Sequence, residues 1–227
     1  KSVPEMANLE KIFFIDATCP LVSKVHREAE QLNKNNFQIL LIGHANHPEV
    51  VGTMGQLPKG SVHLIETKND ALSYINKNEK KLAYISQTTL SVDDTTEIIK
   101  VLKNKFPKIQ GPKREDICYA TTNRQEAVRD LAKHVDLLLV VGSQNSSNSK
   151  RLEEIGREIK IPSYLIDGPS DINKNWLKNV NTVGITAGAS APEAVVMEPP
   201  EERPNNELYD PVVIDPPELF PIAVLNI

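Results

Sequence analysis

The chain has 227 residues, enough for two domains of about 100 residues each, each with its own core. A net charge of −4 and a charged content of 25% are typical of a soluble protein, and no basic cluster indicates a nucleic-acid partner. No apolar run approaches the roughly 20 residues of a membrane-spanning helix, and the first residues do not read as a signal peptide. The two cysteines lie far apart, which favours a reducing compartment.

The first half of the chain alternates between helix and strand patterns. Apolar residues recur at spacings of three and four after Cys19, which predicts an amphipathic helix; they are Val22, Val25, Ala29 and Leu32. Continuous apolar runs, typical of strands buried on both faces, follow at 37–42 and 62–65. A strand with a small-residue loop occupies 83–91. This alternation predicts an α/β fold.

The second half repeats the same order. Cys118, 99 positions after Cys19, is followed by a helix pattern that contains Val128, Leu131 and Ala132. Strand patterns follow at 136–141 and 163–166, and a strand with a small-residue loop at 183–190. The pairs Gly43 and Gly142, and Ser91 and Ser190, are also 99 positions apart. The chain is therefore predicted to contain two copies of one α/β unit, with binding loops at the carboxyl ends of parallel strands.

The two cysteines occupy the same position of the repeat. An isolated cysteine is most often a small buried hydrophobe, but two equivalent ones beside polar loops favour thiols that face a common centre. A disulfide is disfavoured in a reducing compartment, whereas thiolates suit zinc or an iron–sulfur cluster. A third copy of the unit, before Lys1, would supply a third thiolate and leave one iron of a cuboidal cluster open to substrate.

Several segments of the sequence together resemble the LytB/IspH family. They are D-A-T-C-P-L-V-x-K-V-H, G-H-A-N-H-P-E-V-V-G-T-M-G-Q, S-Q-T-T-L-S-V-D-D-T, D-I-C-Y-A-T-T-N-R-Q, V-V-G-S-Q-N-S-S-N-S-x-R-L and G-I-T-A-G-A-S-A-P-E, in the family's order over roughly residues 10–195. The resemblance implies repeated α/β lobes with parallel sheets around a central pseudo-threefold metal site, with two of three lobes present. It also implies a 4Fe-4S cluster held by Cys19, Cys118 and a third cysteine outside this chain.

The resemblance divides the chain into four parts. Residues 1–18 are expected to be a lead-in strand from a first lobe that is absent here, followed by α/β lobes at 19–114 and 115–198. Residues 199–227 contain seven prolines and match no segment of the family, so a long helix is not expected there. The tail is either an extended segment that wraps another lobe or a segment foreign to the family.

Ser146, Ser147 and Asn148 follow a strand and precede a helix pattern, where free N–H groups and the helix dipole favour anions. Simple N-capping is the alternative, and it is the reading favoured for Ser149. Ser190 opens the matching loop of the repeat, and His47 occupies the repeat position of Ser146. By resemblance, His47, Ser146, Ser147, Asn148 and Ser190 bind a diphosphate.

The resemblance assigns catalysis to Glu49, as proton relay, and to Thr88, which organises the substrate hydroxyl, a water and the Glu49 carboxylate. Glu49 also fits a first helical turn, and Thr88 a turn residue with β propensity. Asp16 and Asp116 are assigned to helix capping or to support of the cysteines. His26 and His134 are expected on helix surfaces, and His44 near the site.

The resemblance implies an oxidoreductase, 4-hydroxy-3-methylbut-2-enyl diphosphate reductase, of the non-mevalonate isoprenoid pathway. Its electrons would come from a ferredoxin or flavodoxin, and the expected location is cytoplasmic, or plastidic in a plastid-bearing organism. No nucleic-acid or membrane partner is expected, and no nicotinamide or nucleotide motif occurs. Two alternatives stay open: an inactive fragment or paralogue that binds a phosphorylated small molecule, and a structural zinc protein.

Overall fold

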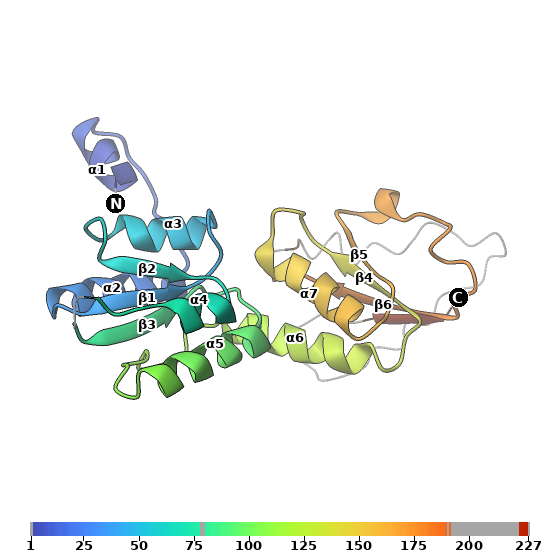
Figure 1. The fold of residues 1–227 in the computed structure, drawn as a ribbon. Helices are drawn as coiled ribbons and strands as arrows, with labels where there is room; N and C mark the ends of the chain where they lie inside the picture. Colours follow the sequence, from blue (N-terminus) through green and yellow to red (C-terminus); the bar gives the residue numbers. More distant parts are fainter. Residues whose placement is uncertain (1, 78–79, 190, 192–222, 227) are drawn as a thin grey trace. The chain divides into compact units, whose positions relative to one another are not determined.

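A computed structural model describes residues 2–77, 80–189, 191 and 223–226 (Figure 1). The chain divides between Cys118 and Tyr119 into two compact units, each of which is described here by itself. None of the described helices is long and apolar enough to cross a membrane.

The first unit is built on a three-stranded parallel sheet. Its strands are β1 (Gln38–Ile42), β2 (Val62–Ile65) and β3 (Leu82–Ser86), in the spatial order β2-β1-β3. The helices are α2 (Pro20–Lys34), α3 (Pro48–Gly55), α4 (Lys68–Ser73) and α5 (Val92–Lys105). Because parallel strands need crossover connections, a helix lies between successive strands.

Alternate residues of the central strand β1 enter two different cores. Ile39 and Leu41 pack with α2 and α3 on one face, whereas Leu40 and Ile42 pack with α4 and α5 on the other. All five residues of β1 are buried, which explains the continuous apolar pattern of the sequence.

The second unit repeats this arrangement. It contains α6 (Tyr119–Leu131), β4 (Leu137–Val141), α7 (Ser147–Glu158), β5 (Ser163–Ile166), the short 3-10 helix η1 (Pro169–Asp171), β6 (Thr182–Ala187) and β7 (Ala223–Asn226). The sheet order is β5-β4-β6-β7, with β4, β5 and β6 parallel. The β5-β4-β6 part matches β2-β1-β3 of the first unit, which confirms the predicted repeated α/β fold with parallel sheets.

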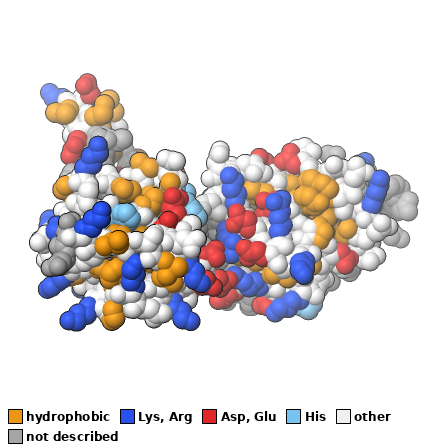
Figure 2. Space-filling view, viewed as in Figure 1, with side chains coloured by type: hydrophobic (Ala, Val, Ile, Leu, Met, Phe, Trp, Pro, Cys, Tyr) orange, Lys and Arg blue, Asp and Glu red, His pale blue; other side chains and the backbone are white. Residues whose placement is uncertain are grey.

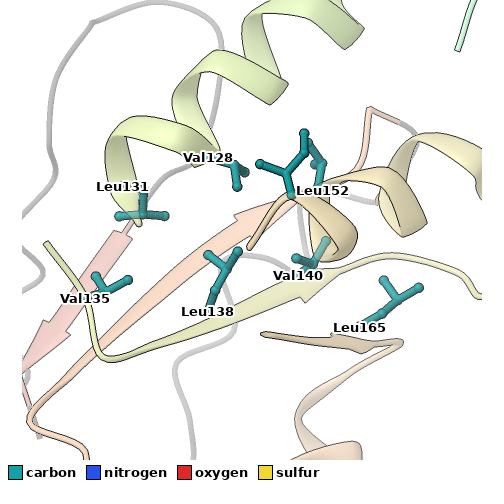
Figure 3. Close-up of a cluster of buried hydrophobic side chains, with 8 residues drawn as sticks. Val128, Leu131, Val135, Leu138, Val140, Leu152 and Leu165 are labelled. Atoms are coloured by element: carbon teal, nitrogen blue, oxygen red, sulfur yellow. The ribbon is translucent and has the colours of Figure 1, made fainter. Parts of the chain in front are cut away.

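One face of the second sheet is covered by α6 and α7. Val128 and Leu131 of α6 and Leu152 of α7 close over Leu138 and Val140 of β4 (Figure 3). The opposite face is covered by the segment after β5, where Trp176 stacks on Tyr164 with ring centroids 3.8 Å apart.

The first 18 residues differ from the expected lead-in strand. Residues Ser2–Leu9 form helix α1, and residues 12–19 have no regular secondary structure. Pro4 lies in the first turn, where a missing N–H costs nothing, and Glu5, Met6, Ala7 and Leu9 favour helix. Apolar side chains of this region are exposed, among them Met6, Leu9 and Phe13. Figure 2 shows orange side chains on the surface where Figure 1 places α1.

The junction between the units, at 118/119, falls later than the expected boundary at 114/115. Asp116 and Cys118 bond to the end of β3, and Ile117 packs against the α4/α5 core of the first unit. Most of the expected tail lies outside the described residues. Near its end, β7 pairs antiparallel with β6.

Candidate functional site

Two strand-end loops of the first unit bring an acid and a hydroxyl together. Glu49 lies in the first turn of α3, after β1, and Thr88 is buried just after β3. The Glu49 carboxylate accepts hydrogen bonds from the Thr88 backbone N–H at 2.8 Å and from Thr88 Oγ1, which is 2.9 Å from each carboxylate oxygen. Carboxyl ends of neighbouring parallel strands meet at one edge of the sheet, which explains this contact across 39 positions.

His47 is the N-cap of α3. Its Nδ1 accepts a hydrogen bond from the Glu49 N–H at 3.3 Å, and Pro48 occupies the first helical position. Burial lowers the pKa of His47, although the charge of Glu49 opposes this shift. A neutral His47 that accepts through Nδ1 carries its proton on Nε2, which leaves Nε2–H as a donor for a ligand.

Gln87 connects the same two loops, and the sequence patterns did not identify it. Its side chain is 2% exposed; Oε1 accepts from the His44 N–H at 3.1 Å, and Nε2 is 3.1 Å from Thr89 Oγ1. The backbone of the His47 loop is thereby tied to the loop that carries Thr88. Because a polar residue at a strand end carries no periodic signal, only the fold reveals this role.

The two cysteines are not joined in a disulfide. Cys19 is exposed and is the N-cap of α2, where its side chain makes no capping hydrogen bond. Cys118 is half-buried, and its N–H donates to the Thr88 carbonyl at 2.9 Å. Cys118 is therefore bonded to the same residue, Thr88, whose side chain donates a hydrogen bond to Glu49.

The aspartates before the cysteines have different environments, and they do not occupy the same position of the repeat: Asp16 lies three residues before Cys19 and Asp116 two before Cys118. Asp16 is exposed and accepts from the Thr18 N–H and Oγ1; the Thr18 side-chain hydrogen bond is the main reason that the pKa of Asp16 is lowered. Asp116 is buried and accepts from Lys24 Nζ and from the Ser86 N–H. Neither aspartate caps α2 or α6, whereas Asp116 does support the backbone before Cys118.

Burial is the largest influence on the pKa values of Asp116 and Lys24. It raises the pKa of the Asp116 carboxyl, and the hydrogen bonds from Lys24 and Ser86 act in the opposite direction. Desolvation would lower the pKa of Lys24, but Asp116 and Glu28 together raise it, so the ammonium stays charged.

The helical position of His26 predicts that it lies on the surface of α2, but the structure does not confirm this prediction. His26 is half-buried in a cavity of about 1200 Å³ that Asp16 and Glu49 also line. The close approach of Gly52 in α3 explains this burial: a Cβ at Gly52 would lie 3.5 Å from His26 Nε2. Burial lowers the pKa of His26. His134 is exposed, as expected, and so is His44.

The corresponding loop of the second unit leads into α7. Ser146 is the N-cap, and its side chain accepts from the Ser149 N–H at 3.3 Å. Ser147 is half-buried in the first turn. Asn148 is 5% exposed, yet neither polar atom of its amide has a hydrogen-bond partner among the described residues. A buried amide without a partner at a helix N-terminus indicates a place for a polar ligand.

Ser149 belongs to the helix rather than to its cap. It packs between Gly142 and Gly188, where a Cβ would collide with its Oγ. These glycines let the start of α7 approach the carboxyl ends of β4 and β6 closely. Ser190, the remaining predicted diphosphate ligand, lies outside the described residues.

The residues present suit part of an iron–sulfur site. Cys19 and Cys118 supply two thiols in one compact unit, and thiolates are the usual ligands of such clusters. The described residues contain no group of three or more His, Cys, Asp or Glu that could hold a metal ion. A cluster bound by these two thiolates would therefore need a further ligand from outside the described part of the chain.

These features define an α/β protein of the parallel-sheet class with its chemistry at the carboxyl ends of the strands. The family model described as "LytB protein" matches residues 1–201, and the chain belongs to this family. The resemblance read from the motifs is thereby confirmed.

Curated relatives carry the name 4-hydroxy-3-methylbut-2-enyl diphosphate reductase. The protein of Phenylobacterium zucineum (strain HLK1) is 56% identical over 196 residues, which are 86% of this chain and 62% of that protein. The protein of Glaesserella parasuis serovar 5 (strain SH0165) is 54% identical over 198 residues, 86% of this chain and 63% of the relative. The chain thus spans less than two thirds of the length of these relatives.

A solved structure has the same fold. The E-1-hydroxy-2-methyl-but-2-enyl-4-diphosphate reductase from Plasmodium falciparum superposes with a TM-score of 0.81 at 43% identity, over 86% of this chain and 61% of that one. A second structure, titled as the terminal enzyme of the non-mevalonate pathway, gives a TM-score of 0.56 at 33% identity, over 86% of this chain and 69% of that one.

Proposed function

We propose that this chain is part of a reductase that converts 4-hydroxy-3-methylbut-2-enyl diphosphate to isopentenyl and dimethylallyl diphosphate. The reaction breaks the allylic C–O bond; two electrons and two protons replace the hydroxyl by hydrogen and release water. The observation that best supports this proposal is the Glu49–Thr88 pair, which sets an acid beside a hydroxyl on the backbone that also holds Cys118. Membership in the LytB family supports the same proposal.

Cys19 and Cys118 would hold a 4Fe-4S cluster together with a cysteine outside this chain, and the bound cluster would supply the electrons. A small one-electron donor such as a ferredoxin or flavodoxin would reduce the cluster again. The polypeptide binds and orients the substrate and moves protons. Glu49 donates protons toward the hydroxyl, and Thr88 fixes the orientation of its carboxylate.

Four of the described residues are proposed as diphosphate ligands. His47 offers Nε2–H, and Ser146, Ser147 and Asn148 surround the N-terminus of α7, where the helix dipole favours an anion. The unpartnered amide of Asn148 supports this assignment because a ligand oxygen would satisfy its N–H₂ group. Ser190 is proposed as a further ligand by its place in the repeat. The proposed location is the cytoplasm, or a plastid in a plastid-bearing organism.

His47→Asn should weaken substrate binding without disturbing α3. Asparagine is a good N-cap and retains the acceptor for the Glu49 N–H, but it lacks the projecting Nε2–H donor. Loss of one donor to a charged phosphate costs about 1.5–3 kcal/mol, so KM should rise roughly 10- to 100-fold. Steady-state kinetics of the complete protein measure this change. His134→Asn, at an exposed position, is the matched control. An unchanged KM in His47→Asn would remove His47 from the binding site.

The colour and metal content of the complete protein, purified without oxygen, separate this function from its alternatives. The proposal predicts a brown protein with broad visible absorption and about four iron atoms per chain. A colourless protein with bound zinc would replace the proposal by a structural zinc site. A colourless, metal-free protein that binds inorganic diphosphate would favour an inactive paralogue.

A further inference from the structure

Three segments of the first unit converge on one partly buried polar network, in which Asp116 is buried and Lys24 partly exposed. They are the start of α2, which follows Cys19; the end of β3, which precedes Thr88; and the segment that leads to Cys118. Each contributes one group close to a proposed site residue: Lys24, Ser86 and Asp116. The sequence separates Lys24 from Asp116 by 92 positions, so the tertiary fold alone brings them together.

The contacts use both oxygens of the Asp116 carboxylate, whose side chain is 0% exposed. Oδ1 lies 2.5 Å from Lys24 Nζ, and Oδ2 accepts from the Ser86 N–H at 2.9 Å. Lys24 Nζ also donates to the Arg114 carbonyl at 2.8 Å and lies 3.2 Å from Glu28 Oε2. The ammonium thus donates hydrogen bonds to Asp116 and to the Arg114 carbonyl, and Glu28 adds an ion-pair contact without a hydrogen bond.

A second hydrogen bond joins the end of β3 to the segment before Cys118, two residues farther along each of them. Ser86 N–H binds Asp116, and Cys118 N–H binds the Thr88 carbonyl at 2.9 Å. The backbone of Cys118 is therefore held against the end of β3 at two points, and Lys24 ties the first point to α2. The repeat counterpart of Asp116 is Ala17, which has no side-chain acceptor, and the neighbouring Asp16 bonds to Thr18 instead.

We propose that the Lys24–Asp116 ion pair is a positioning element that fixes Cys118 and the Thr88 loop relative to the helix that begins after Cys19. Its value for the reaction rests on the proposed function, in which both cysteines hold one cluster. The contacts themselves do not depend on a metal. Buried ion pairs contribute little stability relative to apolar groups of similar size, so a role in fixing geometry explains this pair better than a role in stability.

Local hydrogen exchange tests the positioning role directly. Asp116→Asn removes the charge that pairs with Lys24 but keeps a side-chain oxygen for the Ser86 N–H. The double variant Lys24→Met/Asp116→Asn removes both charges of the pair, and Glu28 keeps its contact with the Lys113 N–H at 3.4 Å. Both are made in the complete protein. Exchange is followed by mass spectrometry of peptides covering 86–88 and 114–118, with peptides from β4 and α7 as internal reference.

Both variants should exchange at least about tenfold faster in 86–88 and 114–118, while β4 and α7 keep their protection. Lys68→Met, which breaks the exposed Lys68–Glu97 pair of the same unit, should change neither region. Unchanged exchange at 114–118 in the double variant would overturn the positioning role, and so would faster exchange spread evenly over both units, since that reports only lost stability. Metal analysis of the unmodified protein is separate: its lack of iron would refute the proposed function and leave the exchange result valid.

Discussion

Glu49→Gln should lower turnover by about 10²–10⁴-fold while the substrate KM changes little, because general acid catalysis contributes a factor of this size. Glutamine has nearly the shape of glutamate, and its amide oxygen can accept from the Thr88 N–H, so the loop geometry is preserved. The amide cannot deliver a proton to the departing hydroxyl. Single-turnover and steady-state rates with a chemical reductant measure the loss, and the visible spectrum reports whether the cluster is retained.

Glu97→Gln is a suitable control for the loss of one acidic group. Glu97 is exposed on α5, where it pairs only weakly with Lys68, so its substitution should change turnover by less than about twofold. Near-normal turnover in Glu49→Gln, with an intact spectrum, would exclude Glu49 as the proton donor.

Cys19→Ser should abolish cluster binding without harming the fold. Cys19 is exposed, and its side chain makes no capping bond at the start of α2, whereas serine is a preferred N-cap. The helix should therefore be at least as stable in the variant. A serine hydroxyl does not ionise as a thiol does, so the affinity for an iron–sulfur cluster should fall by more than about 100-fold.

Iron and sulfide content, measured together with a thermal unfolding curve, separates the two effects of this substitution. The expected variant is folded and colourless, and Cys118→Ser should behave in the same way. Ser23→Ala, one turn into α2, is the control for changes in the helix itself and should keep its iron. A brown Cys19→Ser protein with wild-type iron content would show that Cys19 is not a ligand.

Much of the fold could be predicted from local patterns. The helices after Cys19 and Cys118 and the strands around Leu40 and Leu139 follow from apolar spacing, and the repeat predicts that both units share one topology. The N-terminal segment was harder to predict. Its Ile12–Ile15 run has high β propensity, but a strand needs a neighbour to pair with, and none of the described strands pairs with it.

Only those residues of the candidate site that belong to a sequence motif could be predicted. Glu49 and Thr88 were named from the sequence, and the structure brings them into contact. The roles of Gln87 and Lys24 were not visible, because each depends on a partner that is distant in the sequence. Asp16 and Asp116 look alike in the sequence, yet one is exposed and the other buried, since burial depends on what packs against each segment.

The most direct test of the account is the reaction itself. The complete protein, purified without oxygen, is mixed with 4-hydroxy-3-methylbut-2-enyl diphosphate and a one-electron reductant, and the organic products are identified by mass spectrometry. The account predicts isopentenyl and dimethylallyl diphosphate, formed with two electrons consumed per molecule of substrate. Unchanged substrate in the presence of an intact, reduced iron–sulfur cluster would contradict it.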